Sequence, residues 1–209
     1  LGMPTELLAY GKDEWPDAWP RSSRRLRASE GESGQIDVAA RFEQRRNRSF
    51  VYVQPPNAGL IEMDEAPPLE HDSDAVGLVL TMAAMMDAKP VSALQAMRKT
   101  VVDGSNTSGF QRTTLIATDG SVGTPSGEVG VDVICLEEDS ARKLDTRPSS
   151  SGETVFYTLD RPGMPLVAIA TAPAVQTPAH AQEPAFALDT LLSDTPRSRT
   201  VPGSHKPGP

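Results

Sequence analysis

The chain contains several short, apolar, strand-like segments, and these constrain its fold more than any other feature. They are rich in β-branched and apolar residues and lie at 49–54, 113–119, 128–139, 154–160 and 165–171. We expect another short strand at 59–68, GLIEMDEAPP. Helical patterns do not alternate regularly with these segments, so the sequence does not predict βαβ units. We therefore predict an α+β fold with a largely antiparallel sheet and flanking helices.

One segment has a helical pattern throughout. Residues 74–89, DAVGLVLTMAAMMDAK, follow Asp72 and Ser73, either of which can cap the first turn, and Pro90 ends the segment. We expect the following residues to line its buried face: Val76, Val79, Leu80, Ala83 and Met86. Its methionines are typical of core packing, and a cofactor-binding role is the weaker alternative.

The other segments have weaker patterns. A helix is predicted after Gln35, and a second at 178–195 that Pro184 interrupts. Residues 120–127 read as a turn and 141–153 as a polar linker. For the domain organisation we expect an irregular segment over 1–28, one domain over 29–195 and a disordered tail over 196–209.

Charge and cysteine content limit the function classes. The net charge of the chain is −8, and such an acidic chain as a whole does not favour nucleic-acid binding. Residues 21–48 nevertheless hold eight arginines against four acids, which is either a solvated helix face or an RNA-facing patch. The single cysteine, Cys135, permits no internal disulfide and favours a reducing, cytoplasmic location. We expect neither a signal peptide nor a membrane span.

A polar, glycine-bounded run, DGSNTSG, occupies 103–109 between two apolar stretches. Together with the residues that follow, it offers hydroxyl, amide and guanidinium groups of the kinds that contact phosphate or ribose. The candidate nucleotide- or substrate-binding residues are Ser105, Asn106, Ser108, Gln111 and Arg112. A plain turn is the alternative, and no Gly-Lys-Ser/Thr follows as in a P-loop.

Three acids, Glu137, Glu138 and Asp139, end the strand-like segment 128–139. Adjacent carboxylates repel one another unless they are solvated, paired or bound to a cation. Mg²⁺ takes carboxylate oxygens and bridges to nucleotide phosphates, so a magnesium site is one interpretation and a solvated cluster the other.

Four blocks in this order resemble one known family. They are EMDEAPP, MRKTVVDGSNTSGFQRT, ICLEEDSARK and YTLDRPGMPLVAIATAP. The chain is similar to the GatB/GatE family, and within it to the E subunit of archaeal glutamyl-tRNA(Gln) amidotransferases. The resemblance covers about 29–195 and is densest over 97–173. It implies the cradle-shaped catalytic domain of that family.

The resemblance also implies a reaction. Members use ATP and Mg²⁺ to phosphorylate the γ-carboxylate of glutamate mischarged on tRNA(Gln), and ammonia then displaces the phosphate. The ammonia comes from a glutaminase partner, the D subunit of the enzyme. Carried onto this sequence, Glu137 or Glu138 matches the catalytic, metal-binding carboxylate, and the residues of 105–112 line the nucleotide or substrate pocket.

The sequence departs from the family pattern at several positions. No GLEIHxQL strand occurs in 1–30, Ala168 stands where the family has a metal-binding glutamate, and Pro162 and Gly59 are unusual. The family block GTIRQDVNVS and the carboxy-terminal domains are not matched. We expect a truncated or frame-shifted form of such a gene, with little or no activity by itself. The alternatives are a non-catalytic fragment that binds nucleotide or the D subunit, and an unstable remnant.

Overall fold

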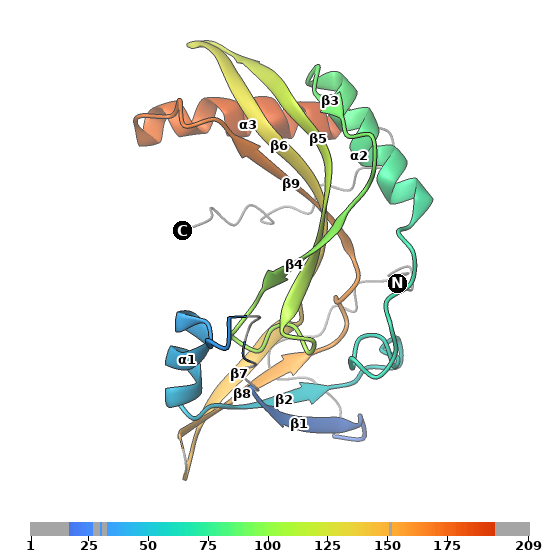
Figure 1. The fold of residues 1–209 in the computed structure, drawn as a ribbon, viewed down its shortest axis with the longest axis vertical. Helices are drawn as coiled ribbons and strands as arrows, with labels where there is room; N and C mark the ends of the chain where they lie inside the picture. The colour runs from blue at the N-terminus through green and yellow to red at the C-terminus, as the bar shows by residue number, and fades with distance from the viewer. Residues whose placement is uncertain (1–16, 27–29, 31–32, 151, 195–209) are drawn as a thin grey trace. The chain divides into compact units, whose positions relative to one another are not determined.

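The computed structural model describes residues 17–26, 30, 33–150 and 152–194, and it divides the chain into two compact units (Figure 1). The first contains Leu1–Glu70, Met97–Arg112 and Glu138–Leu166. The second contains His71–Ala96, Thr113–Glu137 and Val167–Pro209. Each unit therefore draws on three stretches of sequence, and each has a hydrophobic core of its own.

The first unit is built on a four-stranded sheet with the order β1-β2-β8-β7. Its strands are β1 (Arg21–Arg25), β2 (Ser49–Val53), β8 (Gly152–Thr158) and β7 (Arg142–Ser149). The β1–β2 and β7–β8 pairs are antiparallel, whereas β2 and β8 are parallel. The two edge strands, β1 and β7, are the polar ones, as expected where one side of a strand meets water.

Aromatic side chains dominate the core of this unit. Phe50 and Tyr52 from β2 pack with Val155 and Tyr157 from β8, and Met63 and Leu159 extend the cluster. The short helix α1 (Val38–Arg45) begins at Asp37, whose carboxylate accepts from two backbone N–H groups, as expected of an N-cap. The helix predicted after Gln35 is thus confirmed.

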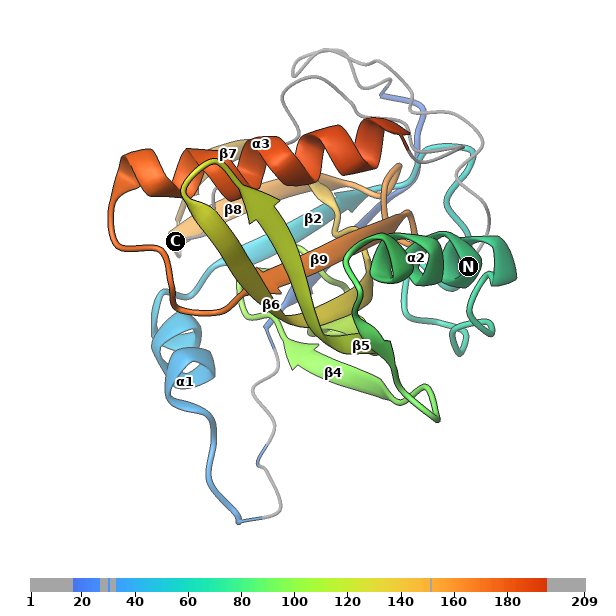
Figure 2. The same ribbon diagram turned by 90° about the horizontal axis from the view of Figure 1, so that it is seen from above.

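The second unit has the strand order β3-β5-β6-β9, formed by β3 (Lys89–Pro90), β5 (Phe110–Thr124), β6 (Gly127–Glu138) and β9 (Pro165–Thr171). Helices α2 (Ser73–Met85) and α3 (Pro178–Asp194) pack on it, as Figure 2 shows. The buried residues where α2 meets the sheet include Val79, Ala83, Ile116 and Ile134. Strand β4 (Ala96–Thr100) pairs with β5.

The α+β prediction is confirmed, because the described residues combine helices with two mostly antiparallel sheets. Strands 49–53, 165–171 and the hairpin of β5 and β6 lie where expected. The hairpin is longer than predicted. Residues 120–124 continue β5 and Gly127 begins β6, so the predicted turn 120–127 shrinks to two residues, Pro125 and Ser126.

One predicted strand does not form, and two segments predicted to be irregular contain strands. The segment 59–68 is a series of turns, held by bonds such as the 2.8 Å contact from the Glu65 N–H to the Leu60 carbonyl. The linker predicted at 141–153 instead contains β7, and the irregular segment 1–28 contains β1. Both segments lack apolar alternation, so they form strands because their backbones pair with a neighbouring strand.

Two helix details also differ from the expectation. In α2 the residues Ala75 and Met82 are buried, whereas Leu80 is 37% exposed, so the buried face is rotated from the predicted one. Helix α3 continues through Pro184. The tail 196–209 lies outside the described residues, and the boundaries 29 and 195 stay predictions. Among the described helices, none is long and apolar enough to cross a membrane.

Candidate functional site

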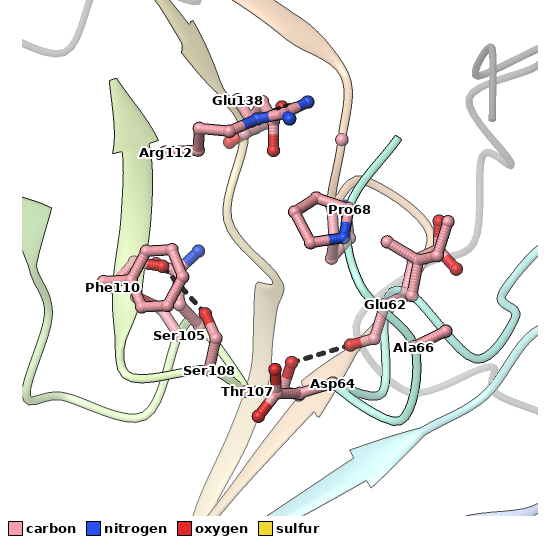
Figure 3. Close-up of a pocket in the computed structure, with 15 residues that line it drawn as sticks. Glu62, Asp64, Ala66, Pro68, Ser105, Thr107, Ser108, Phe110, Arg112 and Glu138 are labelled. Atoms are coloured by element: carbon pink, nitrogen blue, oxygen red, sulfur yellow. Dashed lines mark hydrogen bonds and ion pairs between the residues drawn. The ribbon is translucent and has the colours of Figure 1, made fainter. Parts of the chain in front are cut away.

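A pocket in the first unit collects most of the residues singled out from the sequence (Figure 3). Its walls come from four places: the turns of 61–68, the polar loop at 105–108, the adjoining ends of β5 and β6, and the turn at 162–163. Among the described lining residues, the acids are Glu62, Asp64, Glu138 and Asp139, and the arginine is Arg112. The charged side chains of the pocket are thus mostly acidic.

Two buried tyrosines hold the polar loop in place. The Tyr52 hydroxyl donates to the Gly104 carbonyl at 2.6 Å, and the Tyr157 hydroxyl donates to the Asp103 carbonyl at 2.8 Å. Tyr52 and Tyr157 are register partners on the parallel strands β2 and β8. Burial raises the pKa of both tyrosines, so both remain hydrogen-bond donors through the neutral pH range.

A glycine is required where the loop meets the core. Gly104 has φ +83°, and a Cβ at this position would lie 2.4 Å from Cδ1 of Phe50. The loop backbone therefore rests directly on the aromatic core. Gly109, at the other end of the loop, also has a positive φ, +78°, but a Cβ there would meet no other atom within 4 Å.

Arg112 and Glu138 form an ion pair on one wall of the pocket, with the Arg112 Nε and Nη2 atoms directed at Oε1 of Glu138 (Figure 3). Arg112 also donates from Nη1 to the Leu69 carbonyl at 2.6 Å. The two side chains are only 11% and 17% exposed. Burial raises the pKa of Glu138, and the neighbouring guanidinium partly offsets this rise.

The hydroxyl groups of the loop already donate to protein acceptors. Ser105 donates to the Asp103 carboxylate at 2.6 Å, and Thr107 donates to the Glu62 carbonyl at 2.7 Å. Ser108 donates to the Phe110 carbonyl at 3.0 Å. Each hydroxyl has one proton, so these groups present lone pairs to a ligand unless their hydrogen bonds rearrange.

The amide side chains of the predicted set have different surroundings. Asn106 lines the pocket and accepts from the Ser140 hydroxyl at 2.9 Å. Gln111 donates to the backbone carbonyl of Glu138 at 2.7 Å and does not line the pocket. Gln111 therefore ties the beginning of β5 to the end of β6.

The two acids predicted as alternatives for the metal-binding carboxylate have different surroundings. Glu138 lines the pocket, whereas Glu137 belongs to the second unit and accepts from the Thr113 hydroxyl at 3.3 Å. Successive side chains on a strand point to opposite faces, which accounts for the difference.

Ala168 lies on β9, half-buried, and its methyl side chain has no metal-binding atom.

The side chains around the pocket do not by themselves form a complete site for Mg²⁺. Across the described ranges of the chain, no three histidine, cysteine, aspartate or glutamate side chains are grouped closely enough to hold a metal ion. The carboxylate of Glu138 is also occupied by Arg112. A metal ion at this pocket would therefore need further ligands from a bound substrate or from water.

The wider sequence match decides which family this chain represents. The GatB/GatE catalytic domain matches residues 39–201. The chain belongs to this family. The matched range includes all the described pocket-lining residues and most of both units, so the predicted resemblance is confirmed over most of the chain.

Several similar proteins carry the name of the E subunit of glutamyl-tRNA(Gln) amidotransferase. The chain is 48% identical to that of Pyrococcus furiosus over 173 residues, which are 82% of this chain and 27% of the relative. It is 44% identical to that of Aeropyrum pernix over 190 residues, 90% of this chain and 28% of the relative. It is 41% identical to that of Thermoplasma volcanium over 184 residues, which are 88% of this chain and 30% of the relative. The chain thus spans less than a third of the length of these relatives.

Two groups of residues at the pocket were not identified from the sequence: the tyrosines that hold the polar loop, and the acids in the turns of 61–68. Local patterns place Tyr52 and Tyr157 in strands without assigning them a role, and they place Glu62 and Asp64 in a strand that does not form. A usable signal was present, since each tyrosine lies in a strand-like segment with apolar neighbours and a buried phenol needs a hydrogen-bond partner.

Proposed function

We propose that this chain provides catalytic-domain elements of an ATP-dependent glutamyl-tRNA(Gln) amidotransferase. The reaction converts Glu-tRNA(Gln) to Gln-tRNA(Gln) through a γ-phosphoryl intermediate, with ammonia supplied by a glutaminase partner, the D subunit. The family match over 39–201 carries the proposal. We place this activity in the cytoplasm, where the translation machinery works.

The chemistry sets the task of the pocket. A carboxylate is a poor acyl donor, and attaching a phosphoryl group provides the leaving group that ammonia displaces. Such catalysis depends on positioning and on charge neutralisation rather than on covalent chemistry by the protein. The loop residues Ser105, Asn106 and Ser108 would line the site of the transferred group, where the two hydroxyls would donate to phosphoryl oxygens after leaving their protein acceptors.

Arg112 and Glu138 are proposed to act as a pair in this pocket. Arg112 orients Glu138 while Gln111 fixes the backbone beside it. ATP would bring its Mg²⁺ with it, because Mg²⁺ commonly binds through substrate phosphates, waters and one or two carboxylates. Glu138 is the pocket carboxylate proposed for that contact. Glu137 would contact the metal ion only if the end of β6 were arranged differently.

A second function is favoured by two observations: Ala168 stands where a family ligand is expected, and the Glu138 carboxylate is already paired. In this alternative the chain binds nucleotide or the D subunit and performs no chemistry. Mg²⁺ titration of the unmodified chain and of Ala168→Glu addresses it. Tighter Mg²⁺ binding by the variant supports a metal position near residue 168, and equal affinity places the metal elsewhere.

The experiment for the main proposal combines binding with turnover. Thermal unfolding with and without Mg-ATP measures binding, since a ligand at a hundredfold excess over its Kd adds ~2.7 kcal/mol to the free energy of unfolding. Phosphate release is then followed with Glu-tRNA(Gln) and the glutaminase D subunit. Turnover supports the amidotransferase, and nucleotide binding without turnover supports the second function. An unchanged melting temperature at saturating Mg-ATP, together with no phosphate release, contradicts the main proposal.

A further inference from the structure

Arg98 does not line the pocket itself, but it contacts Phe110, an aromatic residue that does. Every residue of β4 is exposed, and the Arg98 guanidinium lies 5.2 Å from the centroid of the Phe110 ring. Phe110 and Arg112 are two residues apart on β5, so their side chains lie on the same face, and both line the pocket. Arg98 therefore lies beside the same wall as Arg112, one strand further out.

Arg112, which lines the pocket, and two arginines that contact lining residues differ in what neutralises them. Arg112 is paired with Glu138, and Arg161 lies 3.8 Å from the Asp139 carboxylate. Within the described ranges, no carboxylate lies within salt-bridge distance of Arg98, which instead contacts the Phe110 ring. A guanidinium on an aromatic face keeps its N–H groups directed outward, available for a ligand.

The shortage of free hydrogen-bond donors in the pocket also favours Arg98 as a contact for an anionic ligand. The hydroxyl protons of Ser105, Thr107 and Ser108 are engaged by protein acceptors. Asn106 retains its N–H groups, since its oxygen accepts from Ser140 and no acceptor for its nitrogen is found among the described residues. An anionic ligand entering a pocket with four acids needs a cation to offset them, and Arg98 is a cation that no described carboxylate neutralises.

We propose that Arg98 recognises a phosphate group of the ligand that enters this pocket, with the Asn106 amide as a second donor. The inference rests on the proposed function, which supplies two sources of such a group: a nucleoside triphosphate and the phosphodiester end of an RNA. Guanidinium N–H groups match phosphate oxygens in charge and in spacing. Phe110 positions the guanidinium, so little side-chain freedom is lost on binding.

The test compares Arg98→Ala and Arg98→Lys with a matched control. Arg147→Ala removes another exposed arginine of the first unit that lies over a phenylalanine, at 4.8 Å from Phe156. Arg147 is paired with Asp145, and Phe156, unlike Phe110, does not line the pocket. Calorimetric titrations use inorganic pyrophosphate, Mg-ATP and a short single-stranded oligoribonucleotide. All four proteins should melt at nearly the same temperature, because both arginines are exposed.

We expect Arg98→Ala to bind about tenfold more weakly than the unmodified chain, Arg98→Lys to fall between them, and Arg147→Ala to be unchanged. Weakening with pyrophosphate and Mg-ATP alone identifies a nucleotide phosphate. Weakening with the oligoribonucleotide, and a salt-dependence slope lower by about one, identifies an RNA phosphate. Equal affinities of Arg98→Ala and the unmodified chain, or an equal loss in Arg147→Ala, overturn this inference alone. No binding of any probe by the unmodified chain overturns the proposed function as well.

Discussion

Tyr52 and Tyr157 lie side by side on the parallel strands β2 and β8, with their rings stacked at a centroid distance of 5.9 Å. Their hydroxyl groups donate to the carbonyls of two successive loop residues, Asp103 and Gly104. A single element of the core, a stacked tyrosine pair, thereby sets the position of the loop that forms one wall of the pocket.

Removing either tyrosine hydroxyl should loosen the loop. Tyr52→Phe and Tyr157→Phe each leave a loop carbonyl without its donor, and each should lower the free energy of unfolding by about 1–2 kcal/mol. Amide hydrogen exchange should accelerate at 105–109 more than in β2 or β8. Ser126→Ala, which removes an exposed hydroxyl contact to Glu183 at 2.7 Å, serves as the control. Unchanged exchange at 105–109 would show that the tyrosines do not anchor the loop.

Alkaline pH should destabilise the chain through the same two residues. Burial raises the pKa of Tyr52 and Tyr157 above the ordinary value of about 10, so the folded chain keeps protons that the unfolded chain releases. The contribution of these protons to stability is fully present below pH ~10 and is lost as the pH rises above it. Urea unfolding from about pH 8 to 11 measures this fall. The Tyr52→Phe/Tyr157→Phe double variant should show a smaller slope, and an equal slope contradicts the assignment.

Gly104 and Gly109 separate two costs of adding a methyl group. Both have positive φ, but of the two only Gly104 would bring a Cβ into collision with a neighbour, the Phe50 ring. Gly109→Ala should cost about 1–2 kcal/mol from the backbone conformation alone. Gly104→Ala should cost a further ~1–3 kcal/mol from overpacking. Chemical denaturation measures both, and equal losses would mean that Phe50 moves aside without cost.

The ion pair of Arg112 and Glu138 should be sensitive to which partner is removed. Arg112→Ala leaves a mostly buried carboxylate without its counter-ion and should destabilise the chain by about 3 kcal/mol. Glu138→Gln removes the buried charge and keeps an oxygen that accepts from Arg112, so its loss should be smaller. Chemical denaturation at neutral pH compares the two variants. A larger loss in Glu138→Gln than in Arg112→Ala would contradict this ranking.

The pH dependence of Glu138→Gln gives an independent check. Because burial raises the pKa of Glu138, the folded state holds its proton more tightly than the unfolded state, whose pKa is about 4.3. The contribution of that proton to stability is therefore fully present below the unfolded value and is lost as the pH rises through the raised pKa. The free energy of unfolding of Glu138→Gln, minus that of the unmodified chain, should increase across this window. A constant difference would show that the pKa is not raised.

Much of the fold could be predicted from local patterns. Residues 49–53 and 165–171 are rich in β-branched or aromatic residues, which suit the half-buried surface of a sheet. Asp72, one of the two predicted caps, precedes an apolar run and caps α2, accepting from the Ala75 N–H at 2.8 Å. The family, too, was evident from the order of the sequence blocks, and the match over 39–201 confirms it.

Strands β1 and β7 could not be predicted in this way. Their sequences, RSSRR and RKLDTRPS, carry little apolar alternation because they are edge strands with one side in water. Each becomes a strand because β2 or β8 offers it a row of backbone hydrogen-bonding groups. The opposite error occurred at 59–68, where apolar residues suggested a strand but no strand of the described chain pairs with it.

For the candidate site, residue identity shows which chemical groups are available: the hydroxyls and amides of 105–111, Arg112 and the acids that end β6. The partner of each group depends on the three-dimensional fold. It pairs Arg112 with Glu138, bonds Glu137 to the Thr113 hydroxyl and directs the loop hydroxyls to protein acceptors. The reason is physical: a side chain's donors, acceptors and charge follow from its identity, whereas its partner depends on which distant segments the fold brings within hydrogen-bonding distance.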